Sequence, residues 1–260
     1  LWIATFDGGL NKMNSGSGTF VHYKNKPDDP KSLGSQYVHN LIETKSGEIW
    51  VATDGALSLM DRRTATFTNF RNMPDNSKSL SSNIVMNVFS DSNERLWVCT
   101  RFGGVNVYDK DKYGFQLFNH QGLNKNSITS NTVNNFDEDK KGNLYIVMDG
   151  GGLNYMDRQS GTFTDIAPQG TPNGLSINKA LAVEVDNSGK VWVGTWSGGL
   201  NRYDPETKKM KYYKNDPDNP RSLSDNSVFD ILEDRKGNLW IATYGKGLNK
   251  YNPETDDFTP

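Results

Sequence analysis

Tryptophan recurs in this chain at a fixed interval. Five of the six tryptophans are separated by 47 or 48 residues, or by twice that interval: Trp2, Trp50, Trp97, Trp192 and Trp240. Tyr145 lies near the middle of the one double interval, so a pattern close to Leu-Trp-x-x-Thr-x-x-Gly-Gly-Leu-Asn occurs six times. A period of this size indicates one supersecondary unit copied along the chain. It also assigns these tryptophans to the repeat rather than to an active site.

Each repeat contains four short strand-like segments. In one copy, residues 180–185 form an apolar run, and residues 190–195, 200–203 and 209–213 follow as further strands. Turn clusters rich in Asp, Asn, Gly and Pro separate these segments. This spacing predicts an antiparallel meander, and four strands in a period of this length are typical of a β-propeller blade. The Trp or Tyr of the second strand is expected to fill the space between neighbouring blades.

The predicted fold class is therefore all-β, a β-propeller of four-stranded antiparallel blades. Six blades are present in a single domain, 1–260, and the first lacks its innermost strand. The blades have these approximate boundaries: 1–25, 26–72, 73–120, 121–167, 168–215 and 216–260. The chain begins inside a repeat and ends after an outermost strand, so we expect it to be part of a larger ring. A seven-bladed ring is favoured over an incomplete six-bladed one, and an open array leaves strand edges and a blade face exposed.

Charge and cysteine usage exclude several classes of protein. The chain has 29 basic and 31 acidic residues without a basic tract, which argues against a nucleic-acid partner. No apolar run approaches the roughly 18 residues of a membrane span, so direct membrane contact is not expected. The single cysteine, Cys99, excludes a disulfide scaffold and a thiolate zinc site. We interpret Cys99 as a buried space-filler beside the strand tryptophan.

The repeat resembles a known family. Residues 222–228 (SLSDNSV), 234–243 (DRKGNLWIAT) and 247–251 (GLNKY) resemble the two-component regulator propeller repeat, and similar strings recur at 79–108 and 127–156. The resemblance covers essentially the whole chain. It implies the periplasmic ectodomain of an inner-membrane hybrid two-component sensor, in which two stacked propellers and a small β-sandwich precede a membrane span and a histidine kinase. It further implies sensing of glycan fragments.

One turn position varies while its neighbours do not. The residue after the end of the second strand, where five copies have Thr and the fourth has Met148, is aromatic, acidic or basic in different repeats: Phe6, Asp54, Arg101, Asp149, Trp196 and Tyr244. Three further side chains belong to the same turns: Asp7, Phe102 and Lys246. Aromatic faces beside charged groups suit a sugar, which has an apolar face and a rim of hydroxyls. We predict these nine residues as ligand-binding candidates. The alternatives are permissive loop tips or contacts with a neighbouring propeller.

A second set of polar residues recurs on the innermost strand. Asn40, Asn87, Asn135 and Asp230 occupy equivalent positions, where the fifth copy has Ala182. Polar residues on an otherwise apolar strand are expected to point into a central channel, where water or a ligand satisfies them. We therefore predict these four side chains as channel-lining.

Other motifs point to structure rather than catalysis. The Asp-x-x-Gly turns at 139–142, 186–189 and 234–237 each offer one carboxylate, whereas a calcium loop needs several converging oxygens. They are interpreted as hairpin turns with a side-chain cap. The three histidines do not cluster, and no HExxH or Ser/His/Asp order is present. No catalytic residue, metal or cofactor is predicted.

The sequence thus favours non-catalytic recognition of an oligosaccharide, with kinase activity in another domain of the parent protein. A structural or protein-interaction propeller is the alternative, in which the loops contact a neighbouring propeller, a sandwich domain or a second copy in a homodimer. A carbohydrate-active hydrolase or lyase is less favoured. It would require paired carboxylates about 5 to 10 Å apart in the funnel of the propeller.

Overall fold

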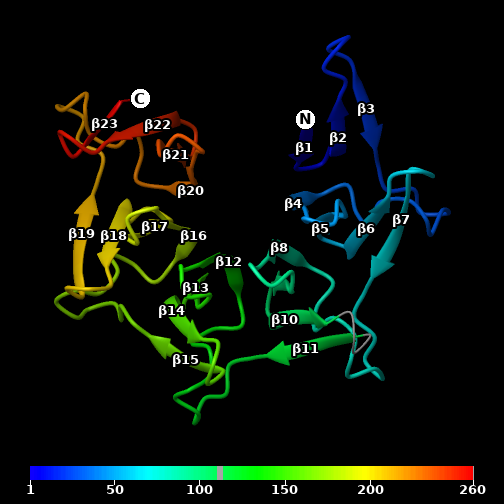
Figure 1. The fold of residues 1–260 in the computed structure, drawn as a ribbon, viewed down its shortest axis with the longest axis horizontal. Helices are drawn as coiled ribbons and strands as arrows, with labels where there is room; N and C mark the ends of the chain where they lie inside the picture. The colour runs from blue at the N-terminus through cyan, green and yellow to red at the C-terminus, as the bar shows by residue number, and fades with distance from the viewer. Residues whose placement is uncertain (110–113, 260) are drawn as a thin grey trace. The chain divides into compact units, whose positions relative to one another are not determined.

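The computed structural model describes residues 1–109 and 114–259 (Figure 1). Within these residues every regular element is a β-strand. The strands form six antiparallel sheets, one for each repeat, and the first sheet has three strands while the others have four. The predicted all-β propeller class, with six blades of which the first lacks its innermost strand, is confirmed. Pro260, the predicted end of the last blade, lies outside the described residues.

The chain divides into two compact units, Leu1–Asn119 and His120–Pro260, which are described separately. Unit 1 holds blades 1 to 3. Blade 1 comprises β1 (Trp2–Thr5), β2 (Gly9–Met13) and β3 (Phe20–Tyr23). Blade 2 comprises β4 (Val38–Glu43), β5 (Ile49–Thr53), β6 (Leu57–Asp61) and β7 (Thr66–Phe70). Blade 3 comprises β8 (Val85–Ser90), β9 (Leu96–Thr100), β10 (Gly104–Asp109) and β11 (Gly114–Phe118).

Unit 2 holds blades 4 to 6. Blade 4 comprises β12 (Val133–Glu138), β13 (Leu144–Met148), β14 (Gly152–Asp157) and β15 (Thr162–Asp165). Blade 5 comprises β16 (Ala180–Val185), β17 (Val191–Thr195), β18 (Leu200–Asp204) and β19 (Lys209–Tyr213). Blade 6 comprises β20 (Val228–Glu233), β21 (Leu239–Thr243), β22 (Gly247–Asn252) and β23 (Asp257–Thr259). The four strands predicted for the copy at 180–213 therefore match β16 to β19.

Each of the five inner strands carries a β-bulge near its beginning. In blade 2, Val38 pairs with Thr53 and Asn40 pairs with Ala52, so His39 has no partner opposite it. The same shift in register leaves one extra residue in every other inner strand. The five bulge residues are His39, Met86, Asn134, Leu181 and Phe229. A bulge re-aims a side chain locally, and it was not predicted from the sequence.

The strand tryptophans pack between neighbouring blades, as predicted. In unit 1 the ring of Trp50 in blade 2 lies 5.7 Å from that of Tyr108 in blade 3. In unit 2 the ring of Trp192 in blade 5 lies 4.7 Å from that of Tyr251 in blade 6. Cys99 is fully buried, which confirms its interpretation as a space-filler, and burial raises the pKa of its thiol well above the ordinary value.

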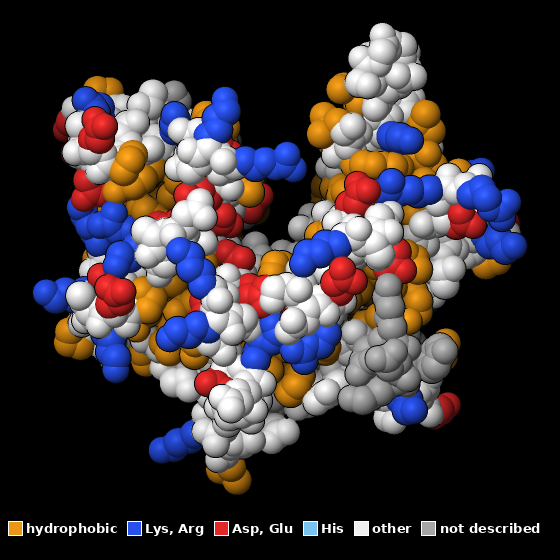
Figure 2. All heavy atoms as spheres, in the orientation of Figure 1, with side chains coloured by type: hydrophobic (Ala, Val, Ile, Leu, Met, Phe, Trp, Pro, Cys, Tyr) orange, Lys and Arg blue, Asp and Glu red, His pale blue; other side chains and the backbone are white. Residues whose placement is uncertain are grey.

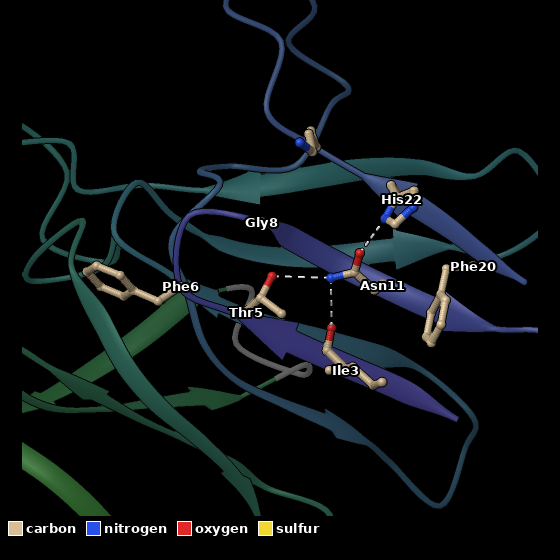
Figure 3. A pocket seen from close by; sticks show the side chains of 8 residues that line it. Ile3, Thr5, Phe6, Gly8, Asn11, Phe20 and His22 are labelled. Atoms are coloured by element: carbon tan, nitrogen blue, oxygen red, sulfur yellow. Dashed lines mark hydrogen bonds between the residues drawn. The ribbon is translucent and has the colours of Figure 1, made fainter. Parts of the chain in front are cut away.

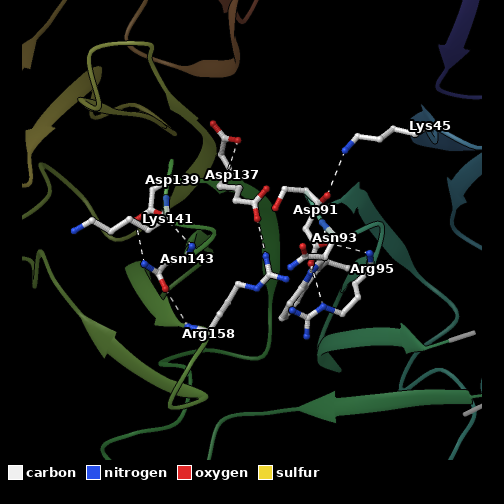
Figure 4. A network of polar contacts seen from close by, with 12 residues as sticks. Lys45, Asp91, Asn93, Arg95, Asp137, Asp139, Lys141, Asn143 and Arg158 are labelled. Atoms are coloured by element: carbon white, nitrogen blue, oxygen red, sulfur yellow. Dashed lines mark hydrogen bonds and ion pairs between the residues drawn. The ribbon is translucent and has the colours of Figure 1, made fainter. Parts of the chain in front are cut away.

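Two of the Asp-x-x-Gly turns hold the tryptophan of the following strand, Trp192 and Trp240, in place. Asp186 Oδ1 accepts the backbone N–H groups of Ser188 and Lys190, both at 2.9 Å, and its Oδ2 accepts the indole N–H of Trp192 at 2.7 Å. Asp234 bonds Lys236, Asn238 and Trp240 in the same way. The turns around Asp91 and Asp139 are drawn in Figure 4. The predicted cap is thus confirmed, and it also orients the ring of the following strand.

Charged side chains of both signs are interspersed on the face of the molecule drawn in Figure 2. This mixture agrees with the small formal net charge of -2. None of the described residues forms a helix long and apolar enough to cross a membrane.

Candidate functional site

In blades 1, 3, 5 and 6, the turns between the second and third strands share one geometry. The Thr that ends the second strand donates its hydroxyl to a carbonyl four residues later, from Thr195 to Gly199 at 2.8 Å and from Thr5 to Gly9 at 2.8 Å. The residue after the variable position adopts the left-handed conformation in several repeats, as at Phe102 (φ 67°) and Ser197 (φ 64°). The turn is therefore closed by the backbone and the Thr, and the variable residue at its tip is free to face outward.

These tips lie at the seam between adjacent blades. In blade 5, the N–H of Trp196 donates to Lys179, at the start of the same blade, at 2.9 Å. The N–H of Gly199 in the same turn donates to Asn226, in the connector that leads to blade 6, at 2.8 Å. Within each unit, the tip of one blade is thereby brought close to the bulge at the start of the next inner strand.

In unit 2, three aromatic rings meet at this seam. Trp196 is the tip of blade 5, Tyr244 is the tip of blade 6, and Phe229 is the bulge residue of blade 6. Their ring centroids lie 5.7 Å apart for Trp196–Phe229, 5.7 Å for Trp196–Tyr244 and 5.5 Å for Phe229–Tyr244. All three side chains remain exposed: Trp196 is 41% exposed, Phe229 46% and Tyr244 63%. We refer to these three residues as the aromatic cluster.

In unit 1, the corresponding positions hold Phe6, His39 and Asp54. The ring of Phe6 lies 4.9 Å from Tyr37 and 6.2 Å from His39. His39 Nε2 lies 2.7 Å from Asp54 Oδ1. Phe6 is 73% exposed, while Asp54 is half-buried. We refer to Phe6, Tyr37, His39 and Asp54 as the mixed cluster.

The structure thus brings some predicted ligand-binding residues together and leaves others apart. Trp196 meets Tyr244 directly, and Phe6 is linked to Asp54 through His39. Three members of the clusters were not predicted: Tyr37, His39 and Phe229. The inner-strand bulge position varies between repeats as much as the tip does, from His39 to Phe229, and this variation was the signal that could have found two of them.

The remaining predicted ligand-binding residues lie on the tips but outside the two clusters. Asp7 accepts a hydrogen bond from Gln36 Nε2 at 2.7 Å. The guanidinium of Arg101 lies 5.2 Å from the centroid of Phe102, whose ring is 69% exposed on a left-handed backbone. Asp149 and Lys246 are exposed. Phe102 in this conformation is an energetically costly arrangement for a large side chain.

The four residues predicted to line a channel share a strand position but not an environment. Asn87 is buried, Asn40 and Asn135 are half-buried, and Asp230 is exposed. The Oδ1 atoms of Asn135 and Asp230 each accept the backbone N–H of the following residue, at 2.7 and 3.0 Å. Their role in a channel stays a prediction.

Half-buried carboxylates connect the inner strands of unit 2. Asp137 Oδ2 in blade 4 accepts the N–H of Val185 in blade 5 at 2.5 Å, and Glu184 Oε1 in blade 5 accepts the N–H of Glu233 in blade 6 at 2.7 Å. Figure 4 draws Asp137 in a network of polar contacts that also contains Asp139 and Arg158. Burial, and then the nearby charge of Asp137, raises the pKa of Glu184 to about 8. Burial raises the pKa of Asp137 to about 6.

These carboxylates are engaged in holding one blade to the next. A hydrolase would need an acid and a base free to reach a substrate, whereas one oxygen of each group here accepts a backbone N–H. Within residues 1–109 and 114–259, no group of three or more His, Cys, Asp or Glu side chains is arranged to hold a metal ion.

A pocket of about 550 Å³ lies on blade 1 (Figure 3). Ile3, Asn11, Phe20 and His22 line it, and Asn11 Oδ1 lies 2.5 Å from His22 Nδ1. Alternate residues of the same strands, such as Leu10, pack on the other side against blade 2. The counterparts of Ile3 in the other blades, such as Val51 and Val193, are fully buried. The pocket is therefore the type of surface that a neighbouring blade covers elsewhere in the chain, and we do not assign it to a ligand.

Comparison with known proteins places the chain in a class. The family model described as two component regulator propeller matches residues 32–55 and 222–245. The chain therefore carries two-component regulator propeller repeats, which confirms the resemblance seen in the sequence. Comparison with curated protein sequences found no match.

Solved structures extend the likeness over nearly the whole chain. The extracellular domain of BT3049 from B. thetaiotaomicron, assigned to a hybrid two component system, is 25% identical with a TM-score of 0.77, and the match covers 96% of this chain and 31% of that one. The extracellular domain of BT4673 from the same organism is 21% identical with a TM-score of 0.74, and the match covers 99% of this chain and 33% of that one. Virginiamycin B lyase from Staphylococcus aureus is 12% identical with a TM-score of 0.70, and the match covers 100% of this chain and 80% of that one. The second and third likenesses concern the fold alone. The chain spans about a third of the length of the two extracellular domains.

Proposed function

We propose that this chain is a non-catalytic sensing propeller in the extracytoplasmic part of a hybrid two-component sensor, and that it recognises glycan fragments. The two-component regulator propeller repeats and the likeness to an extracellular domain of a hybrid two component system support the sensing role. In this proposal the parent protein is anchored in the inner membrane with this part in the periplasm. The kinase activity belongs to another domain.

The aromatic cluster is the observation that carries glycan recognition. Trp196, Phe229 and Tyr244 form a contiguous apolar surface at one blade seam, although each ring is at least 41% exposed. A contiguous exposed apolar surface of this kind is a feature of interaction sites. A sugar ring offers an apolar face that stacks on such side chains and hydroxyls that remain hydrated at its rim.

The position of the cluster also suggests how binding is transmitted. Trp196 belongs to blade 5, whereas Phe229 and Tyr244 belong to blade 6, so one bound ligand contacts both blades. A ligand that binds one arrangement of these blades more tightly shifts the population toward it. That shift is the signal that a neighbouring propeller or sandwich domain of the parent chain receives.

Calorimetry tests this proposal. The chain is titrated with neutral and acidic oligosaccharides from plant and animal glycans, beside a Trp196→Ala variant. We expect one class of oligosaccharide to bind, and its affinity to fall about tenfold or more in the variant, as for an aromatic residue at the centre of a binding site. Phe20→Ala is the matched control, because it removes another exposed ring outside the cluster.

If no oligosaccharide releases heat, and if Trp196→Ala loses a self-association that the wild type shows, the result would instead support a protein-interaction propeller. Sedimentation velocity of both proteins measures that association. If the wild type and Trp196→Ala bind an oligosaccharide with equal affinity, the aromatic cluster is not the site of glycan recognition.

A further inference from the structure

The mixed cluster of unit 1 occupies the same repeat positions as the aromatic cluster of unit 2. Phe6 corresponds to Trp196, His39 to Phe229 and Asp54 to Tyr244, because each is a tip or a bulge residue at a blade seam. We propose that the mixed cluster is a second, separate saccharide site, which binds an uncharged sugar residue through one aromatic face and one carboxylate. This inference extends the proposed function from one site to two.

The turn that carries Asp54 is built differently from the other tips. Three residues separate Thr53 from Leu57, whereas four separate Thr5 from Leu10. Gly55 packs so closely that an added Cβ would lie 2.4 Å from the carbonyl oxygen of Gly34. Asp54 itself donates its N–H to Tyr37 at 3.2 Å. The shortened turn therefore fixes the backbone that presents this carboxylate.

His39 fixes the carboxylate group itself. Its Nε2 lies 2.7 Å from Asp54 Oδ1, and its side chain is only 18% exposed. Within the described part of the chain, no hydrogen bond is made to the other carboxylate oxygen of Asp54. An acceptor held in one orientation, with one oxygen open, is suited to receive sugar hydroxyls at little further cost in entropy.

Phe6 supplies the apolar surface. Phe6 also lines the pocket of blade 1, and Figure 3 shows its ring at the end of that pocket away from Asn11 and His22. Tyr37 supports the ring from one side, with centroids 4.9 Å apart, and Phe6 is still 73% exposed. A sugar stacked on Phe6 would direct hydroxyls toward Asp54.

The charge of the cluster selects the class of sugar. Asp54 accepts hydroxyl protons but repels a carboxylated sugar. Arg71 donates to the carbonyl of Gly55 through Nε, and Asp7 accepts a hydrogen bond from Gln36, so the charged groups placed near the turn are of both signs. A neutral pyranose is therefore the expected ligand, in contrast with the aromatic cluster, in which no member is charged.

Nuclear magnetic resonance of the histidine side chains tests this site. The chain has three histidines, so the imidazole signal of His39 can be assigned with a single His39→Gln variant. Neutral xylo-, cello-, manno- and galacto-oligosaccharides are added to the whole chain at up to millimolar concentration. We expect at least one of them to shift the His39 signal saturably, while the corresponding uronic acid oligomer shifts it less.

Variants then separate the two sites. Asp54→Asn is expected to weaken the response of His39 about tenfold, as for loss of a hydrogen bond to a charged group. Asp75→Asn, at an exposed position in the connector between blades 2 and 3, is expected to leave it unchanged. Trp196→Ala should weaken binding at the aromatic cluster about tenfold or more and leave the response of His39 intact.

The outcomes distinguish this inference from the proposed function. If oligosaccharides bind at Trp196 while the His39 signal never moves, the second site is refuted and the proposed function stands. If His39 responds equally in Asp54→Asn, the carboxylate plays no part and the inference is wrong. If His39 responds and Trp196→Ala changes no binding, the second site stands and the assignment of glycan recognition to the aromatic cluster fails.

Discussion

Trp196 and Phe229 belong to different blades, yet their rings meet edge to face with centroids 5.7 Å apart and planes inclined at 69°. One comes from a turn between strands and the other from a bulge within a strand. Their contact exists because the turn of blade 5 bonds the connector of blade 6 and because the bulge re-aims Phe229.

Phe229→Ala should weaken oligosaccharide binding by about as much as Trp196→Ala does, because aromatic pairs of this kind contribute beyond their buried area. Isothermal titration calorimetry measures both affinities and that of the double variant. Leu181→Ala, at the bulge of blade 5, is the matched control. Full affinity in Phe229→Ala would show that the bulge residue is not part of the site.

Two tryptophans close in sequence should differ sharply in their effect on stability. Trp192 is 1% exposed and packs between blades 5 and 6, so Trp192→Ala should lower the free energy of unfolding by about 3 to 5 kcal/mol. Trp196→Ala should lower it by less than about 1 kcal/mol, because the ring stands at the surface. Urea unfolding followed by circular dichroism compares them. Similar losses in the two variants would contradict the assignment of Trp196 to a binding surface.

Removing the carboxylate of Asp186 should destabilise blade 5. Asp186→Ala deprives the N–H groups of Ser188 and Lys190, and the indole N–H of Trp192, of their acceptor. Loss of these bonds should cost about 1 to 3 kcal/mol, since hydrogen bonds to a charged group are strong and Trp192 is buried. Thermal unfolding measures the effect. Asp218→Ala, in an exposed connector, is the control and should leave the midpoint unchanged.

Stability should fall with rising pH because of Glu184. Burial and Asp137 raise its pKa to about 8, so the folded protein keeps a proton that the unfolded chain releases above its ordinary pKa of about 4.3. The stabilisation is complete below that ordinary value and is lost as the pH rises through 8. Glu184→Gln stays neutral and can still accept the N–H of Glu233. The midpoint of its thermal unfolding at pH 9 should therefore exceed that of the wild type by at least about 2 to 4 °C.

The control for this pH effect is Glu206→Gln, which changes an exposed carboxylate in a turn of the same blade. Its midpoint should follow that of the wild type from pH 5 to 9. Asp137 contributes in the same direction up to its raised pKa of about 6, so measurements at pH 5, 7 and 9 distinguish the two groups. A constant difference between Glu184→Gln and wild type at all three values would contradict the proposed titration.

Local sequence determined the blades. The apolar run before Asp186, the glycine turn after Thr195 and the alternation along β16 to β19 act within a few residues of one another, so they could be recognised without knowing the fold. The burial of Trp192 followed as well, since a fixed period requires each copy to pack on the next. The exposed tips Phe6, Trp196 and Tyr244 were also found, because the tip position differs between copies that otherwise repeat.

Tertiary structure alone decided which of these tips act together. The bulge at His39 or Phe229 depends on strand pairing, which a single strand does not encode. The seam that unites Trp196 with Phe229, or His39 with Phe6, brings together side chains from separate repeats. Each copy specifies its own blade through short-range signals, whereas a shared surface arises only when two blades pack and their backbones bond across the gap between them.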